Sequence, residues 1–232
     1  GQTGSISANT GLLARTGYTF SGWVTNIDGT GTPKNSGDTV TFAAADINLY
    51  PQWSANTYTI SYNLNGGSGS LSGAPTSWTV GTPNVTLPSS GFTKTGYDFA
   101  GWAKVQNGSA VNNSFNNIGD VTLNALWTLK AISYSFDKGT ANGLTIAGWP
   151  TNSTSTFGSS ITLPDLSGTV VSISSQSYMF FGWKFGASTF ESGDTFTLGE
   201  TAPTFEAQWV QVFDVRYGYA GGTHSQAGDT DE

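Results

Sequence analysis

The chain has 232 residues, of which 10% are charged and 13% aromatic, and it carries a net charge of −7 with no cysteine. Its eight Lys and Arg residues are scattered singly, so no basic patch exists to bind nucleic acid, and disulfides and zinc-thiolate sites are excluded. No apolar run approaches the roughly 18 residues of a membrane span. The chain starts with GQTGSISANTG and not with a signal peptide, and this start predicts an excerpt of a longer protein.

The first predicted unit, residues 1–54, contains three features in a fixed order. They are a strand that ends in a Gly-Trp step, a Gly-Asp turn, and a closing strand that ends in Trp. In this unit they are TGYTFSGW (16–23), Gly37–Asp38 and INLYPQW (47–53). In an extended strand Tyr18 and Phe20 share one face and Trp23 lies on the other, so only a bulge or turn at the glycine would bring the three rings into one core.

The second predicted unit, residues 55–128, opens with a strand that the first unit lacks. Tyr58, Ile60 and Tyr62 alternate with polar residues, and this period of two indicates a strand with one buried face. A Gly-rich turn and a short VTLP strand follow, and then the three features return. They are TGYDFAGW (95–102), Gly119–Asp120 and VTLNALW (121–127).

The third predicted unit, residues 129–209, repeats this order with more divergence. Its alternating strand carries Ile132, Tyr134 and Phe136. Its three features are SYMFFGW (177–183), Gly193–Asp194 and TFEAQW (204–209). The connection LSGTVVSISSQ (166–176) is longer than in the second unit, so a surface site shared by all units is not expected here.

This ordered set of motifs resembles the Listeria–Bacteroides repeat, the B-repeat family of internalin-type bacterial surface proteins. The resemblance is carried by YTISYNLNGG, NVTLPSSGFTKTGYDFAGW and VTLNALW in residues 56–128, more loosely by 129–209, and by the back half of a unit in 1–55. It implies small modules strung between the cell wall and a distal adhesive domain. The expected fold is therefore mostly β, with tandem β-grasp-like repeat modules in series, and the expected location is extracellular, at the bacterial cell surface.

Residues 210–232 are expected to hold the first strand of a further repeat and an acidic tail, whereas the first unit lacks such a strand. One interpretation is a fragment cut between two repeats. The other is donor-strand exchange, in which the C-terminal strand of one copy fills the groove of the next copy's first unit and a head-to-tail fibre forms. The predicted donor residues alternate along the chain and are Phe213, Val215, Tyr217 and Tyr219.

The tryptophans fall into two groups. Those that recur in the repeat are predicted to be structural core anchors, because a buried indole ring removes roughly 150–250 Å² from water. These are Trp23, Trp53, Trp102, Trp127, Trp183 and Trp209. The two that do not recur, Trp78 and Trp149, are expected to be freer to lie on the surface and are the candidate ligand contacts, because indole faces stack on sugars.

Catalytic and metal-binding residues are not expected. The one histidine, His224, lies in a tail rich in Gly and Asp, and no other His or Cys is present to complete a nucleophile–base pair. The Asp residues of the Gly-Asp turns are interpreted as caps of their own backbone, while the alternative, a calcium site, lacks its oxygen-rich loop. We therefore predict no catalytic residue, no metal and no cofactor.

The sequence favours a non-catalytic stalk or spacer segment of a bacterial adhesin-type surface protein, whose partners are the neighbouring repeats of the same protein. One alternative is a self-assembling fibre subunit that binds another copy head to tail. The other is a module that binds a host glycan or receptor. Nucleic acid and a membrane span in this segment are not expected.

Overall fold

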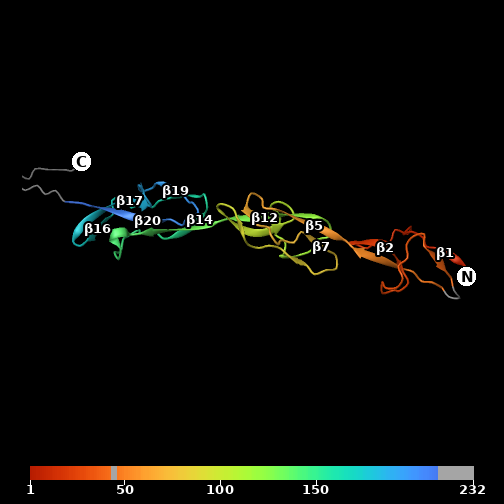
Figure 1. The fold of residues 1–232 in the computed structure, drawn as a ribbon. Helices are drawn as coiled ribbons and strands as arrows, with labels where there is room; N and C mark the ends of the chain where they lie inside the picture. Colours follow the sequence, from red (N-terminus) through yellow and green to blue (C-terminus); the bar gives the residue numbers. More distant parts are fainter. Residues whose placement is uncertain (43–45, 214–232) are drawn as a thin grey trace, which may run out of the picture. The chain divides into compact units, whose positions relative to one another are not determined.

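The structure is a computed structural model that describes residues 1–42 and 46–213 (Figure 1). In these residues the chain forms strands β1 to β20 and one 3-10 turn, η1 (Gly139–Ala141), without an α-helix. The described part contains no helix long and apolar enough to cross a membrane. The chain divides into two compact units, Gly1–Leu129 and a second that begins at Lys130. The expected mostly β class is confirmed.

The first compact unit holds two repeats. We call the first of them the incomplete repeat, because no strand among the described residues lies parallel to its closing strand, and the second the complete repeat. The strands of the incomplete repeat are β1 (Thr3–Ser5), β2 (Tyr18–Val24), β3 (Thr39–Thr41) and β4 (Tyr50–Ala55). The strands of the complete repeat are β5 (Thr57–Asn63), β6 (Ser68–Gly69), β7 (Ser77–Thr79), β8 (Val85–Thr86), β9 (Phe92–Thr93), β10 (Tyr97–Ala103), β11 (Ser114–Phe115) and β12 (Val121–Leu129).

The main sheet of the complete repeat has the strand order β10-β12-β5-β7. Strand β12 pairs antiparallel with β10 and parallel with β5, so the first and last strands of the repeat are neighbours. Parallel pairing requires a long crossover connection, which the chain between β5 and β12 supplies. The alternation read from the sequence buries Ile60 in a core with Trp102 and Leu123, both of which are 0% exposed.

The second compact unit is a complete repeat with a larger sheet. Its strands are β13 (Ala131–Asp137), β14 (Ser153–Thr156), β15 (Ser160–Thr162), β16 (Val170–Ile173), β17 (Gln176–Phe185), β18 (Ser188–Phe190), β19 (Thr195–Thr197) and β20 (Thr204–Gln211). The sheet order is β14-β13-β20-β17-β16, with β18 also paired to β17. The lengthened connection therefore forms an extra strand, β16, which pairs with β17. Strand β13 again lies parallel to the closing strand, β20.

A β-bulge occurs at the glycine of all three Gly-Trp steps. The pairing register shifts between Phe20 and Gly22, between Phe99 and Gly101, and between Phe180 and Gly182. A bulge inserts one extra residue and so moves the next side chain to the other face. The Phe and Trp rings of each phrase consequently meet edge to face, with centroids 5.3, 5.3 and 5.2 Å apart. The bulge thus unites the Phe and Trp rings as expected, whereas the tyrosine does not join them in the second repeat, where Tyr97 lies against Lys94 outside the core cluster.

The structure corrects the position of the second repeated feature, the Gly-Asp turn, in the second repeat. In each repeat a turn precedes the second strand of a short antiparallel ladder (β1–β3, β8–β11 or β15–β19), and this turn is the Gly-Asp turn only in the first and third repeats. In the first and third repeats, Asp38 and Asp194 each accept a backbone N–H three residues back, at 2.7 and 2.8 Å. In the second repeat Asn113 takes this place, because its carbonyl accepts the Leu87 N–H as those of Asp38 and Asp194 accept Ile6 and Leu163. Asp120 instead accepts the Thr59 N–H at 2.7 Å and so fixes the start of β5.

Candidate functional site: an apolar groove in the first repeat

The tryptophan of each Gly-Trp step is anchored in the same way. Its indole N–H donates to a backbone carbonyl just beyond the short strand that opens the ladder. The pairs are Trp23 to Ser7 at 3.1 Å, Trp102 to Pro88 at 2.7 Å and Trp183 to Pro164 at 2.9 Å. These bonds establish that the three repeats superpose residue by residue at this position, although Ser7 replaces the proline in the first.

The three tryptophans differ in how they are covered. Trp102 and Trp183 are 0% exposed, whereas Trp23 is only half-buried. In the complete repeats the opening strand covers the indole with an aromatic ring. Tyr62 lies 4.9 Å from Trp102, and Phe136 lies 5.0 Å from Trp183, between ring centroids. The incomplete repeat has no corresponding strand among the described residues, which explains the exposure of Trp23.

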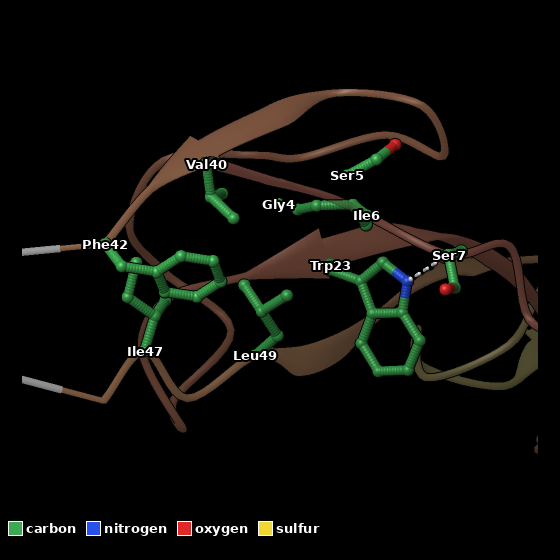
Figure 2. A pocket seen from close by; sticks show the side chains of 9 residues that line it. All are labelled: Gly4, Ser5, Ile6, Ser7, Trp23, Val40, Phe42, Ile47 and Leu49. Atoms are coloured by element: carbon green, nitrogen blue, oxygen red, sulfur yellow. Dashed lines mark hydrogen bonds between the residues drawn. The ribbon is translucent and has the colours of Figure 1, made fainter. Parts of the chain in front are cut away.

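An apolar groove of about 410 Å³ lies at this place in the first repeat (Figure 2). Its nine lining residues include no charged side chain. The apolar members are Ile6, Trp23, Val40, Phe42, Ile47 and Leu49. Figure 2 shows Phe42 and Ile47 at one end of the groove and Trp23 at the other, with Leu49 between them. Phe42 and Ile47 are 41% and 37% exposed, so apolar surface that a core would bury is open to solvent.

Within residues 1–42 and 46–213, the closing strand beside the groove has no parallel neighbour. In the complete repeat β12 begins at Val121 and pairs with β5, whereas β4 begins only at Tyr50, which corresponds to Asn124. Residues 47–49, the counterparts of the paired residues 121–123, are therefore not part of a strand. No backbone hydrogen bond pairs residues 47–49 within the described part of the chain, so this edge is of the kind to which a further strand can add.

The closing tryptophan shows the same deficit. Trp127 donates its indole N–H to the Leu64 carbonyl at 3.0 Å, and Trp209 donates to the Lys138 carbonyl at 2.8 Å. Both acceptors follow the opening strand of their repeat. The corresponding Trp53 has no partner for its indole N–H among the residues that the structure describes. In the other repeats the opening strand and the residue after it supply an aromatic ring over the Gly-Trp indole and a carbonyl for the closing indole. The described part of the first repeat supplies neither group.

The other tryptophans are placed as follows. The closing tryptophans are half-buried, each at an edge-to-face distance of 5.6–5.8 Å from the Phe of its own repeat. Trp78, expected on the surface, is instead 8% exposed, because β7 pairs with β5 and turns the ring into the core. Trp149 is half-buried and packs against Trp183, with centroids 5.6 Å apart. The ring of Trp78 is therefore closed to a sugar, whereas Trp149 keeps part of its ring exposed.

Of the predicted donor residues, only Phe213 belongs to the described part, and its side chain is 77% exposed. Val215, Tyr217 and Tyr219 lie outside the described residues. The same holds for His224. Three lining residues, Trp23, Ile47 and Leu49, lie in the repeated motifs, but the sequence alone did not bring them together with Val40 and Phe42 in one groove.

The titratable groups whose pKa is shifted do not line the groove. No three His, Cys, Asp or Glu residues there lie close enough together to hold a metal ion. Hydrogen bonds from Thr30 lower the pKa of Asp28, and bonds from Ser167 lower the pKa of Asp165, both on exposed turns. Burial raises the pKa of Tyr62, whose hydroxyl donates to the Pro75 carbonyl at 2.9 Å. Each shift has a local structural cause.

Comparison with known families decides the identity of the repeats. The sequence profile of the Listeria-Bacteroides repeat domain matches residues 3–52 and 58–132, which is more than half of the chain. The chain belongs to the Listeria-Bacteroides repeat family. The two matched stretches are the incomplete repeat and the complete repeat of the first compact unit. The third repeat lies outside the match, yet it has the same Gly-Trp bulge, the same indole bond and the same parallel pairing.

Two relatives come from Evansella cellulosilytica. One, named as a Gly-rich membrane protein, is 34% identical over 146 residues, which are 57% of this Listeria-Bacteroides repeat chain and 16% of the relative. The other, named as a membrane protein, is 43% identical over 49 residues, which are 21% of this chain and 7% of the relative. The chain therefore spans less than a fifth of the length of either relative.

A solved structure was also found. It contains SHIRT domains 3–4, Streptococcal High Identity Repeats in Tandem, from a cell surface protein, and is 16% identical with a TM-score of 0.25. The similarity covers 67% of this chain and 98% of the other. At that TM-score the two structures need not share a fold.

Proposed function

We propose that the chain is a non-catalytic stalk or spacer segment of a bacterial adhesin-type surface protein, located outside the cell. The observation that supports this most is the length of the linkers. Strand β4 ends at Ala55 and β5 begins at Thr57, while β12 ends at Leu129 and β13 begins at Ala131. The two complete repeats close their own cores, and each repeat passes into the next through one residue, as a spacer requires.

The linker of the first compact unit is held from both sides. The Asn56 N–H donates to the Gly17 carbonyl at 3.0 Å, and the Asn56 carbonyl accepts the Val80 N–H at 3.0 Å. The Thr19 hydroxyl also donates to the Asn56 side-chain oxygen at 2.6 Å. A linker with its backbone bonded to both neighbours loses the rotations that make a hinge. This supports a stiff joint, and nearest-neighbour contacts of this kind set the stiffness of repeat arrays.

We also propose the finer description of each complete repeat as a β-grasp-like module, with boundaries at 55–128 and 129–209. Residues 1–54 would be an incomplete repeat, and 210–232 would begin a further one. The parallel pairing of the first and last strands supports this description, with the connection between them closing the core. The long relatives named as membrane proteins support a location at the cell envelope.

A glycan-binding or receptor-binding role gains less support. It depended on Trp78 and Trp149 as exposed stacking platforms, and both rings pack against core residues. We therefore propose the neighbouring repeats of the same protein as the partners of each repeat.

Distance measurements between two spin labels test the stiff joint. The chain has no cysteine, so Ser21→Cys and Asn112→Cys, both at exposed positions, take one label each. We expect a narrow distance distribution that broadens when two glycines are inserted after Asn56. The same insertion after Gly29, in an exposed turn, is the control and should leave the distribution narrow. A distribution that is already broad without the insertion would contradict a spacer.

A further inference from the structure

A separate groove lies in the edge of the sheet of the third repeat. Strand β20 pairs with one edge of β17, and the other edge is shared by two short strands, β16 at residues 176–179 and β18 at residues 183–185. Residues 180–182, at the bulge, lie between these two partners, and a groove of about 580 Å³ opens there. Ligand sites commonly have volumes of about 300–1,000 Å³. Neither Trp78 nor Trp149, the expected ligand contacts, lines this groove.

The side chains of this groove do not follow the repeat pattern. Among the described strands of the first two repeats, none corresponds to β16. The shared bulge aligns Phe181 with Ser21 of the first repeat. Glu191 aligns with Asn35, because each donates its backbone N–H to the Asp three residues further on. The fold of a repeat therefore requires neither an aromatic ring nor a carboxylate at these two positions.

The apolar part of the groove is open to water. Phe181 is 67% exposed and Met179 is 38% exposed, and both line the groove. Large apolar side chains that a fold does not require and that lie together at a concave surface are typical of binding sites.

The polar part of the groove presents hydrogen-bond acceptors. The Ser167 hydroxyl donates to the Asp165 carboxylate at 2.6 Å, and the Ser192 hydroxyl accepts the Leu166 N–H at 3.3 Å. Hydrogen bonds from Ser167 and then from Ser192 lower the pKa of Asp165. A hydroxyl carries one proton, so these two serines turn lone pairs towards the groove. The hydroxyl of Thr189, which also lines the groove, can accept as well.

The charge of the groove is negative. The carboxylate of Glu191 is exposed and has no hydrogen-bond or ion-pair partner among the residues that the structure describes. No Lys or Arg is among the nine lining residues. Lys184, the cation nearest to the bulge along the chain, stands opposite Thr189 and Glu206 in the sheet. Lys184 thus has a carboxylate on the neighbouring strand, whereas Glu191 has no cation beside it.

We propose that the groove of the third repeat binds a Lys or Arg side chain that projects from a partner protein. These side chains combine an apolar stem with a cation that only donates hydrogen bonds, which matches both parts of the groove. The stem packs on Met179 and Phe181, and the cation is attracted by the Phe181 ring and by Glu191. Because the groove lies at an exposed sheet edge, the backbone that carries the side chain can pass outside it. The same charges disfavour an anionic ligand.

Nuclear magnetic resonance of the isotope-labelled full chain tests the site. The probe is n-butylguanidinium, which has the stem and the cation of an arginine side chain. We expect saturable shifts of the amides of Gly168, Phe181 and Ser192, with an affinity in the millimolar range. The affinity is low because one exposed cation–π contact and one exposed ion pair each contribute little. The uncharged probe n-pentanol should leave these amides unchanged.

Two variants test the two parts of the groove. Glu191→Gln removes the charge, and Phe181→Ser introduces the residue type that the first repeat has there. Each should weaken butylguanidinium binding about two- to five-fold. Both positions are exposed, so the fold should be retained. The matched controls, Glu206→Gln and Val170→Ser, make similar changes at exposed positions outside the groove and should bind like the unchanged chain.

A short peptide separates a protein partner from a free amine. The peptide Gly-Ser-Arg-Ser-Gly with blocked ends should shift the same amides, and the same peptide with citrulline in place of arginine should not. Three results would overturn the proposal: no shift with butylguanidinium, equal binding of the citrulline peptide, or binding of butylguanidinium without the arginine peptide. Shifts of these amides with cellotetraose but not with butylguanidinium would assign the groove to a glycan instead. None of these results bears on the spin-label distances, so failure here leaves the stalk proposal intact.

Discussion

Individual side chains in this protein act through two contacts at once, one with an aromatic ring and one with the backbone. Trp102 meets Phe99 and Tyr62 edge to face and donates its N–H to Pro88. A large ring with a satisfied donor can be fully buried without the cost of an unpaired polar group. Trp78 shows the contrast, because it is buried with no partner for its indole nitrogen in the described residues.

Replacement of Trp102 should therefore be severe. Trp102→Ala removes a side chain that is 0% exposed, and we expect it to lower the unfolding free energy of the first compact unit by about 3–5 kcal/mol. Trp53→Ala, at a half-buried ring with an unpaired donor, should cost less than half of that. Urea denaturation followed by circular dichroism measures both. Loss of the transition of the second unit in Trp102→Ala would contradict separate cores.

The buried hydroxyl of Tyr62 predicts a pH dependence. Because burial raises its pKa in the folded state, its contribution to stability is present below the ordinary tyrosine pKa and is lost as the pH rises above about 10. Tyr62→Phe removes the bond to Pro75 and should cost about 1 kcal/mol at pH 8. The difference in unfolding free energy between the unchanged protein and Tyr62→Phe should shrink at higher pH. A difference that stays constant up to pH 11 would show that this hydroxyl does not titrate with unfolding.

At the scale of the elements, the bulged strand organises each core. The bulged strand occurs in all three repeats, as β2, β10 and β17, but the reason why its bulge requires a glycine differs between β10 and β17. Gly101 has a φ of +118°, which L side chains rarely adopt, and a Cβ there would meet nothing closer than 3.9 Å. Gly182 has no such φ, but a Cβ there would lie 2.5 Å from the Phe190 carbonyl oxygen. Backbone strain excludes a side chain at the first site, and a steric clash excludes it at the second.

Alanine substitution should separate these causes. We expect Gly101→Ala and Gly182→Ala each to cost about 1–3 kcal/mol, the first through backbone strain and the second by displacing β18. Gly199→Ala, where a Cβ would meet nothing within 4 Å, is the control and should be close to neutral. Amide exchange would then show faster opening around Phe190 only in Gly182→Ala. Equal exchange in both variants would argue against the distinction.

The strands that recur could be predicted from the sequence, and those that do not recur could not. Alternation identified β5 and β13, and three copies of the Gly-Trp phrase identified β2, β10 and β17. The burial of Trp78 and the pairing of β7 depend on a tertiary contact that no local pattern encodes. Gly119–Asp120 was wrongly matched to the Gly-Asp turns of the other repeats. The residue whose carbonyl takes the place of those of Asp38 and Asp194 is Asn113, and it is neither an Asp nor preceded by a Gly. The groove became visible only when Val40 and Phe42 came next to Trp23.

At the scale of the whole molecule, the chain is a series of cores that differ in completeness. Two repeats have an opening strand parallel to their closing strand, and the described residues of the first contain no such strand over Trp23. Only one residue separates the last strand of each repeat from the first strand of the next. The exposure of Trp23 is therefore a property of the first repeat and not of the repeat pattern as a whole.

The parallel pairing of the first and last strands determines how a repeat responds to a pull on its ends. The chain enters a complete repeat at the start of β5 and leaves it at the end of β12, and these strands run side by side in the same direction. Tension along the chain therefore drags one strand lengthwise past the other. The hydrogen bonds of the ladder share this shear and must break together, whereas peeling a hairpin apart breaks them one at a time.

Single-molecule pulling can compare the two directions. We expect the complete repeat of residues 55–129 to resist end-to-end tension at a higher force than the same repeat pulled through Asp98→Cys and Thr128→Cys, which lie opposite each other on β10 and β12. Equal forces would contradict the shear geometry. Among the described residues the first repeat has no such parallel pair of strands, so it should yield at a lower force than the two repeats that have one. The direction in which a repeat is pulled, and not only the size of its core, thus determines the force that it withstands.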